Sequence, residues 1–466
     1  MAWLLALIPT ALILWFHFRN QRKSEYLVRA SNYWIIFYVL GYFPPILPFV
    51  AGEDAWTILW GYSFSNFDTS LTYAVLVATA GGLLLSLSAA PRRRRRLKPA
   101  KVVPMVAGLD PTKDQCYQLK WARVFMVTTV ALGALFVGVE LVGGLQELLA
   151  NLGDRINLFA GLNAFFLPLY LLIGVCFALS AFRATGGKIS ARAEWAAIGI
   201  TLPALLLLGS KSNIFILIVG IGIIKLISRG GIKLRWALAG AFLLANLLIL
   251  YEFMFREALI IGLDPERLKP SAWFEYMIFQ LTGNFMQIQN LTVLVEALPD
   301  VLPYSFGVTY IVFFSLIIPQ SIIGIKPLGA TGIYTLAFWP EVVARESTTM
   351  PPGLFGEAYL NFGLAGYLIG CILIGLLLRK IDRPFQSGKA MNSMDLVSIA
   401  AFGSMALHFI RGEFFAPFLI LVGIFLGARI VLVTAPRRVG PVRRSRTPRT
   451  FSSPPPEPLA PEPDHG

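Results

Sequence analysis

Two short clusters of polar side chains could carry chemistry in a chain that is otherwise mostly apolar. One cluster holds Glu357 and Asn361, which are four residues apart and therefore share one face of a helix. The other contains His408, Arg411 and Glu413, and the first two of these also share a helical face. A carboxylate or an imidazole can take a proton from a reacting group, and a guanidinium can bind an anion. These side chains are the first functional candidates.

Three cations and one tyrosine extend the set. Lys211 lies in a short polar turn between two apolar runs, and Arg256 and Arg345 lie in a long segment that precedes Glu357. Tyr359 belongs to the same helical segment as Glu357. If the apolar runs cross a membrane, each of these charges lies in or beside it, where an unneeded charge is costly.

A structural interpretation competes for most of the candidates. Lys211 could be a lysine whose stem lies along a membrane interface. His408 could be a packed core residue, and Glu357 could be a carboxylate that stabilises a helix N-terminus. Glu413 could simply neutralise Arg411. The spacing leaves these alternatives open, and it does not rank Glu357 against His408 as a base.

Several familiar catalytic motifs are missing from the sequence. There is no His-x-Glu, Cys-x-x-Cys or HExxH spacing, so a zinc site is not expected. No Walker A or GxGxxG motif opens a helix, so no ATP or dinucleotide site is expected either. The three cysteines cannot build a disulfide framework. We therefore predict chemistry without a cofactor.

The elements that position these residues must be membrane helices. Of the 466 residues, 56% are hydrophobic and only 14% are charged, whereas charged residues make up about a quarter of an ordinary soluble protein. The sequence predicts an all-α polytopic integral membrane protein with about eleven spans, within a range of about 10–12. The predicted spans are 2–18, 33–50, 70–90, 124–145, 160–182, 195–209, 213–228, 236–255, 358–378, 395–410 and 414–433.

The distribution of charge orients these spans. If alternate loops are cytoplasmic, they hold 32 of the 40 Lys and Arg residues, which is the asymmetry that the positive-inside rule describes. The N-terminus is then external and the C-terminus cytoplasmic. The run Arg92–Arg96 follows a span directly, so it is interpreted as a topology signal that contacts anionic lipids. The net charge of +14 therefore does not indicate nucleic acid.

One segment does not fit a simple count of spans. Residues 308–323 are nearly all apolar, yet a single crossing there would move the basic tail to the wrong face. A large external loop with interfacial or re-entrant helices preserves the orientation, and so does a pair of crossings with 277–298. The predicted regions are 1–255 with about eight spans, 256–357 as the external loop, 358–434 with three spans, and 435–466 as a disordered cytoplasmic tail rich in Arg and Pro.

Three stretches, in order, resemble the Wzy-type O-antigen and exopolysaccharide polymerases over residues 300–413. They are Tyr304-x-x-Gly307-x-x-Tyr310 with Ile318-Pro319 and Lys326-Pro327, then Gly356-Glu357-x-Tyr359-x-Asn361-Phe362-Gly363-x-x-Gly366, then Arg411-Gly412. The turn at Lys211 is similar to a place where the family often carries Gly-Ser-Arg. Lysine there keeps the charge but loses the two-pronged geometry of a guanidinium.

The resemblance implies an enzyme of the bacterial cytoplasmic membrane that moves a growing glycan from one undecaprenyl diphosphate carrier onto the next lipid-linked repeat unit. Its partners would be these lipid-linked glycans and membrane lipids. A chain-length regulator and a flippase of the same pathway are further candidate partners. It assigns Glu357, His408 and Arg411 to catalysis. The substrate-binding residues would be Lys211, Arg256, Arg345, Tyr359, Asn361 and Glu413.

Two other functions remain open at this point. An O-antigen ligase would need the same cations and base, so the residues barely separate it from a polymerase. A transporter or flippase for lipid-linked sugars should show polar residues near span centres and two related halves. Neither feature is seen in this sequence, which favours an enzyme whose site opens at the external face of the membrane.

Overall fold

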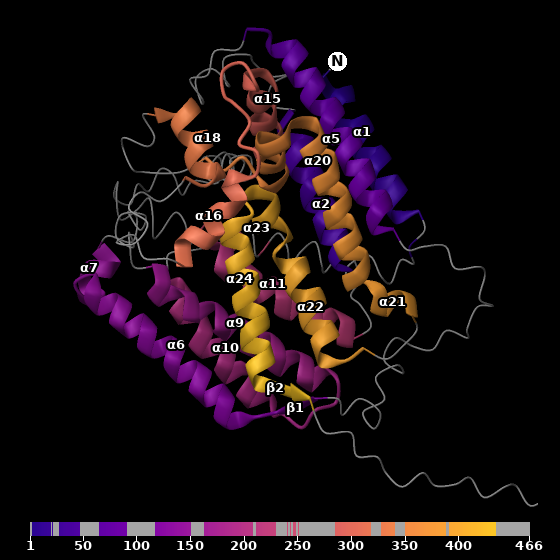
Figure 1. Ribbon diagram of the computed structural model, residues 1–466. Helices are drawn as coiled ribbons and strands as arrows, with labels where there is room; N and C mark the ends of the chain where they lie inside the picture. The colour runs from indigo at the N-terminus through magenta and orange to yellow at the C-terminus, as the bar shows by residue number, and fades with distance from the viewer. Residues whose placement is uncertain are drawn as a thin grey trace, which may run out of the picture.

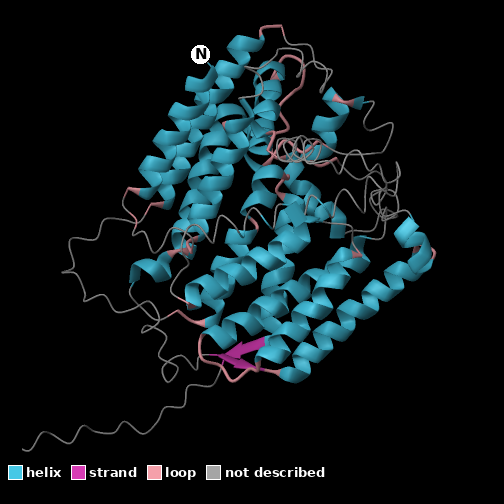
Figure 2. Ribbon diagram, turned by 180° about the vertical axis from the view of Figure 1, so that it is seen from behind, coloured by secondary structure: helices cyan, strands magenta, loops and turns pink. Residues whose placement is uncertain are grey.

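The computed structural model is a bundle of helices with one short pair of strands (Figures 1 and 2). It describes residues 2–19, 21, 28–46, 65–90, 117–150, 163–207, 211–229, 285–317, 328–340, 350–387 and 391–434, with single positions at 240, 243, 246, 247 and 250. Arg256 and Arg345, the run Arg92–Arg96, the tail 435–466 and most of the predicted span 236–255 lie outside the described residues.

The first part of the chain forms eight helices and one strand among the described residues. They are α1 (Ala2–Phe18), α2 (Ala30–Tyr42), α5 (Phe67–Ala89), β1 (Tyr117–Leu119), α6 (Trp121–Leu141), α7 (Gly144–Ala150), α9 (Asn163–Ala184), α10 (Ala191–Leu206) and α11 (Lys211–Ser228), with a 3-10 turn at Pro44–Ile46.

The second part contributes eight more helices and the other strand. They are α15 (Gln287–Ala297), α16 (Val308–Ile317), α18 (Ala330–Phe338), α20 (Leu354–Ile381), α21 (Arg383–Ser387), α22 (Ser393–Ser404), α23 (Ala406–Arg411), α24 (Phe415–Val431) and β2 (Leu432–Thr434).

The prediction of a helical membrane protein is confirmed. In the described part of the chain, five helical stretches are long and apolar enough to cross a membrane. They are Phe67–Ala89, Trp121–Leu141, Leu167–Ala184, Leu354–Ile381 and Ser393–Arg411, and three shorter apolar helices cover Leu4–Phe18, Ser212–Ser228 and Phe415–Val431. The total of eleven spans stays a prediction.

Helix starts follow local sequence signals. The Asn66 side chain accepts a hydrogen bond from the Thr69 N–H at the start of α5. Asn392 and Asp395 form a reciprocal capping box at the start of α22. These bonds satisfy N–H groups that have no partner within the helix, so the capping residues mark where α5 and α22 begin.

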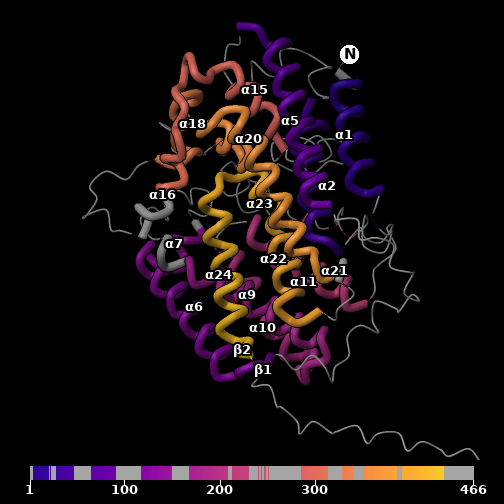
Figure 3. The backbone as a smooth tube through the Cα atoms, turned by 45° about the vertical axis from the view of Figure 1, so that its right-hand side comes forward, coloured from indigo at the N-terminus to yellow at the C-terminus, as the bar shows by residue number. Residues whose placement is uncertain are grey.

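Among the described helices, α24 packs most extensively against α9, and the two lie along each other in Figure 3. A Cβ on Gly174 would lie 2.1 Å from the Ile424 carbonyl oxygen, and one on Gly427 would lie 2.2 Å from the Leu171 carbonyl oxygen. Only glycine allows the two backbones to come this close. In a membrane, where lipid is as apolar as leucine, such close contact is a main source of helix association.

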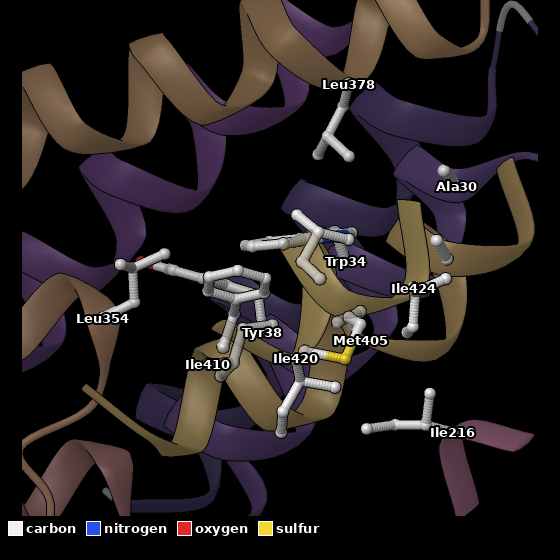
Figure 4. Close-up of a cluster of buried hydrophobic side chains, with 14 of the residues drawn as sticks. Ala30, Trp34, Tyr38, Ile216, Leu354, Leu378, Met405, Ile410, Ile420 and Ile424 are labelled. Carbon is white, nitrogen blue, oxygen red and sulfur yellow. The ribbon is translucent and has the colours of Figure 1, made fainter. Parts of the chain in front are cut away.

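A buried apolar core joins α2, α11, α20, α23 and α24 (Figure 4). Trp34 and Tyr38 from α2 and Ile424 from α24 are almost fully buried there. The Trp34 ring also packs on the Phe409 ring of α23, with centroids 5.5 Å apart. This core holds α23 and the start of α24 in a fixed position against α2.

A strand pair, which the all-α prediction did not include, closes one end of the bundle (Figure 2). Tyr117 pairs with Thr434 and Leu119 with Leu432 in antiparallel register. Each strand has only three residues, too few to show the alternating pattern by which strands are recognised. The pair fixes the start of α6 to the end of α24.

The sequence predicts a span over 358–378, and the structure shows an interruption of the helix near its start. Backbone angles at Phe362 and Gly363 are not helical, and Gly363 has φ 61° and ψ −150°. A Cβ on Gly366 would lie 2.3 Å from the Ala358 carbonyl oxygen, and one on Gly370 would lie 3.5 Å from Ala358 Cβ. In a straight helix these residues would be roughly 12–18 Å apart. Residues 354–361 therefore fold back along residues 364–381, and we call this arrangement the α20 hairpin.

The structure also describes part of the apolar segment 308–323, whose crossing of the membrane the sequence left open. Its described portion is α16, which has ten residues. Such a helix is roughly 15 Å long, about half of a bilayer core. Within the described residues, α16 is therefore a short helix and not a complete crossing.

Candidate active site

Glu357 lies on residues 354–361, the first arm of the α20 hairpin. It is buried, with 1% of its surface exposed. One carboxylate oxygen accepts a hydrogen bond from the Thr309 hydroxyl at 2.7 Å. The other accepts from the backbone N–H of Phe414 at 2.6 Å. Thr309 is in the first turn of α16, and Phe414 directly precedes α24. One carboxylate thus joins the starts of three helices, where the helix dipoles favour a negative charge.

Asn361 organises the surroundings of this carboxylate. Its side-chain oxygen accepts from the Gly307 N–H at 2.7 Å. Its amide nitrogen donates to the Thr309 hydroxyl oxygen at 2.7 Å and to the Glu357 carbonyl at 2.8 Å. The Asn361 side chain is fully buried, and these bonds use both ends of its amide. In this structure it holds protein groups in place, and the substrate-binding role that the resemblance implies stays a prediction.

The same asparagine stabilises a strained turn. Phe306 has φ 44°, in the left-handed region that side chains other than glycine rarely adopt. The Phe306 N–H donates to the Asn361 carbonyl at 3.1 Å, next to the bond from Gly307. A strained residue of this kind costs roughly 1–3 kcal/mol and persists only where its surroundings fix it. The Asn361 bonds provide that fixation.

A second carboxylate lies nearby at the start of another helix. Glu413, in the link between α23 and α24, accepts from the Thr331 N–H in the first turn of α18 at 2.8 Å. It is within electrostatic range of Glu357. The starts of α16, α18, α20 and α24 thus converge on two carboxylates.

Three of the remaining predicted residues lie on another helix or on another face of the same helix. His408 and Arg411 are both on α23, three residues or more before Phe414. Within the described chain, the partners of the Glu357 carboxylate do not include His408. Tyr359 is 5% exposed and is turned roughly 200° around the helix axis from Glu357, toward Tyr304 and Tyr73.

Lys211 is the first residue of α11, whereas the sequence suggested that it lies in the turn before that helix. The helix packs against α9 and α22. Among the described residues, no group of three or more His, Cys, Asp and Glu side chains is placed to hold a metal ion.

Sequence reasoning missed the residues that hold Glu357. Thr309 lies inside the stretch from Tyr304 to Tyr310, but it is 48 positions from Glu357 and nothing in its own spacing marks it. Phe414 contributes only a backbone N–H, which no side-chain pattern can reveal. The one available signal was that both residues belong to or directly follow stretches shared with the polymerases.

The structure therefore brings together three stretches that are far apart in the sequence. Comparison with known proteins agrees with the resemblance seen in these stretches. A family model described as O-antigen polysaccharide polymerase Wzy matches residues 195–435, slightly more than half of the chain. The matched region contains Lys211, Thr309, Glu357, Asn361 and Arg411. No curated protein and no solved structure matches the chain. The extent of the match shows that the chain belongs to the Wzy family of O-antigen polysaccharide polymerases.

Proposed function

We propose that this protein polymerises undecaprenyl diphosphate-linked repeat units into O-antigen or exopolysaccharide at the external face of the bacterial cytoplasmic membrane. The family acts on lipid-linked oligosaccharide repeat units in membranes. The observation that carries the proposal is the convergence of the three family-like stretches on the buried Glu357 carboxylate.

The reaction balances with groups that the chain carries. A hydroxyl oxygen of the acceptor repeat unit attacks the anomeric carbon of the growing glycan. The bond from that carbon to the diphosphate oxygen breaks, and its electron pair leaves with undecaprenyl diphosphate. The hydroxyl proton passes to a general base and then to water. The protein must supply the base and stabilise the departing anion.

Glu357 is our choice for the base. Both of its oxygens accept hydrogen bonds, one from the Thr309 hydroxyl and one from the Phe414 N–H, as expected for an ionised carboxylate that can take a proton. A carboxylate has about four acceptor positions, so about two are not used by these two bonds. His408 has no such set of partners in the described chain, and we assign it a supporting role on α23.

Arg411 is the first candidate for stabilising the departing diphosphate. It ends α23 and precedes Phe414 by three residues, so the link that holds Glu357 also fixes the position of Arg411. A guanidinium binds a diphosphate through paired, charge-assisted hydrogen bonds. Lys211, Arg256 and Arg345 are proposed as further cations for the same anion, with no metal ion required.

The orientation remains a proposal based on charge. The strand pair lies at the end of the bundle that also carries Lys120, Arg123 and Arg429, as expected for a cytoplasmic end. The N-terminus would then be external and the tail cytoplasmic.

The first test is a glycan profile of cells that lack the gene. A polymerase predicts that long polymer disappears and that single repeat units accumulate on the acceptor. If long polymer persists on the lipid carrier, the protein is not the polymerase and the ligase alternative is supported.

The second test separates Glu357 from His408. Purified full-length protein in nanodiscs is assayed with lipid-linked repeat units extracted from the gene-deletion strain. Glu357→Gln should lower kcat by roughly 10²–10⁴-fold at saturating substrate, whereas His408→Gln should keep most of the rate. Wild-type kcat in Glu357→Gln would overturn the assignment. Loss of activity together with loss of folding, measured by thermal unfolding, would show that Glu357 is a structural tether instead.

A further inference from the structure

We infer that Thr309 is a positioning residue that fixes the Glu357 carboxylate for proton transfer. The inference rests on the proposed function of Glu357 and adds a residue that the sequence did not identify. Thr309 is 2% exposed, and its hydroxyl lies 2.7 Å from both Glu357 Oε1 and Asn361 Nδ2.

The directions of the hydrogen bonds around Thr309 follow from the groups that can only donate or only accept. A backbone N–H can only donate, so the bond from Gly307 identifies the accepting atom of Asn361 as its oxygen. The other end of the amide is then the nitrogen, and its bond to the Glu357 carbonyl agrees with this. The amide nitrogen donates to Thr309 Oγ1. An ionised Glu357 carboxylate can only accept, so the Thr309 hydroxyl donates to Glu357 Oε1.

This arrangement makes the carboxylate an acceptor at both oxygens. Thr309 donates to Oε1, and the Phe414 N–H donates to Oε2. Two donors on opposite oxygens restrict rotation of the carboxylate about its last bond. The Thr309 hydroxyl uses its hydrogen bonds on Glu357 and Asn361, so Thr309 acts through Glu357 and not on the sugar.

Three variants test this role in the nanodisc assay with extracted lipid-linked repeat units. Thr309→Val keeps the shape but removes the hydroxyl, and Thr309→Ser keeps the hydroxyl. The matched control is Thr292→Val on α15, where a similarly buried hydroxyl bonds, among the described residues, the Ile288 carbonyl of its own helix at 2.8 Å.

Thr309→Val should lower kcat by roughly 10–100-fold, because a misplaced catalytic group commonly costs that much, while KM stays close to wild type. Thr309→Ser should recover most of the rate, and Thr292→Val should keep it. Equal rates for Thr309→Val and Thr292→Val would overturn the inference, and so would a Thr309→Ser variant as slow as Thr309→Val.

A double variant separates positioning from general damage to the fold. If Thr309 acts through Glu357, adding Thr309→Val to Glu357→Gln should lower the residual rate no further. A further loss of the same 10–100-fold would show an independent effect and contradict the inference. Wild-type kcat in Glu357→Gln alone would instead refute the proposed role of Glu357 as the base. If Glu357→Gln loses most of its rate, and Thr309→Val slows the wild-type protein but not the Glu357→Gln variant, the results support both the role of Glu357 and the positioning role of Thr309.

Discussion

Alanine substitutions of the glycines along the α20 hairpin should fall into two classes with opposite effects on the free energy of unfolding. Gly363→Ala places a side chain at φ 61° and ψ −150°, a conformation close to a region that is essentially restricted to glycine. The new Cβ would also lie 3.1 Å from the Tyr304 hydroxyl oxygen. Gly366→Ala would place its Cβ 2.3 Å from the Ala358 carbonyl oxygen, a distance that real contacts do not reach. Gly370→Ala serves as the matched control, because its Cβ would meet Ala358 Cβ at an ordinary 3.5 Å.

The expected magnitudes follow from these contacts. Gly363→Ala should cost roughly 1–3 kcal/mol of unfolding free energy through backbone strain. Gly366→Ala should cost a similar amount, typically about 1–3 kcal/mol, because the two arms must move apart. Gly370→Ala should stabilise the helix by about 0.5–1 kcal/mol, since alanine loses less conformational freedom than glycine on folding.

Activity should follow the position of the first arm. Gly363 directly follows the segment whose carbonyls accept from the Ser305 and Phe306 N–H groups and whose Asn361 side chain organises the site. A shift of about 1 Å in that arm would lower polymer formation by about 10²-fold. The assay is unfolding of the purified variants in detergent micelles, together with gels of glycan length from cells with matched protein levels.

A straight helix predicts a different outcome. All three glycines would then lie in regular helical turns, and each alanine would be neutral or stabilising by about 0.5–1 kcal/mol. Equal stability and normal polymer length in all three variants would refute the hairpin, and with it the position that we assign to Glu357.

Two further predictions concern charge. Arg411→Ala should abolish polymer while the protein still inserts, with a loss of roughly 10²–10³ in rate, and Arg411→Lys should recover only part of it. Normal polymer length at wild-type protein level in the alanine variant would remove Arg411 from the site. Cysteines introduced at Ser271 and Thr348, after removal of the native cysteines, should react with an impermeant thiol reagent in intact cells. Reaction only after lysis would reverse the orientation derived from the positive-inside rule.

Much of the helical architecture was predictable because its signals are local. An apolar run of about 20 residues is recognisable wherever it occurs, and it predicts a helix that can cross a bilayer. Helix α1 has the predicted bounds, and α5, α9 and α24 begin and end within a few residues of them. Short elements were less predictable, because the three-residue strands and the ten-residue α16 offer too little pattern.

The α20 hairpin shows where local signals fail. Its apolar composition is the same for a straight helix and for a reversal at Gly363, and glycine is compatible with both. The reversal is visible only in contacts such as Gly366 against Ala358, which depend on how the arms pack. It moves Glu357 away from the end of the span, roughly 8 Å back along the hairpin from its turn.

The sequence by itself determined the membrane class, the family-like stretches and Glu357, Asn361 and Arg411 as residues of interest, since these depend on composition and short spacings. Only the tertiary structure decided which groups meet: Thr309 and the Phe414 N–H hold the Glu357 carboxylate from 48 and 57 positions away. The physical reason is that a hydrogen bond requires a distance of about 3 Å in space, whatever the separation along the chain. Helix packing sets that distance, and the two sequence positions do not encode it.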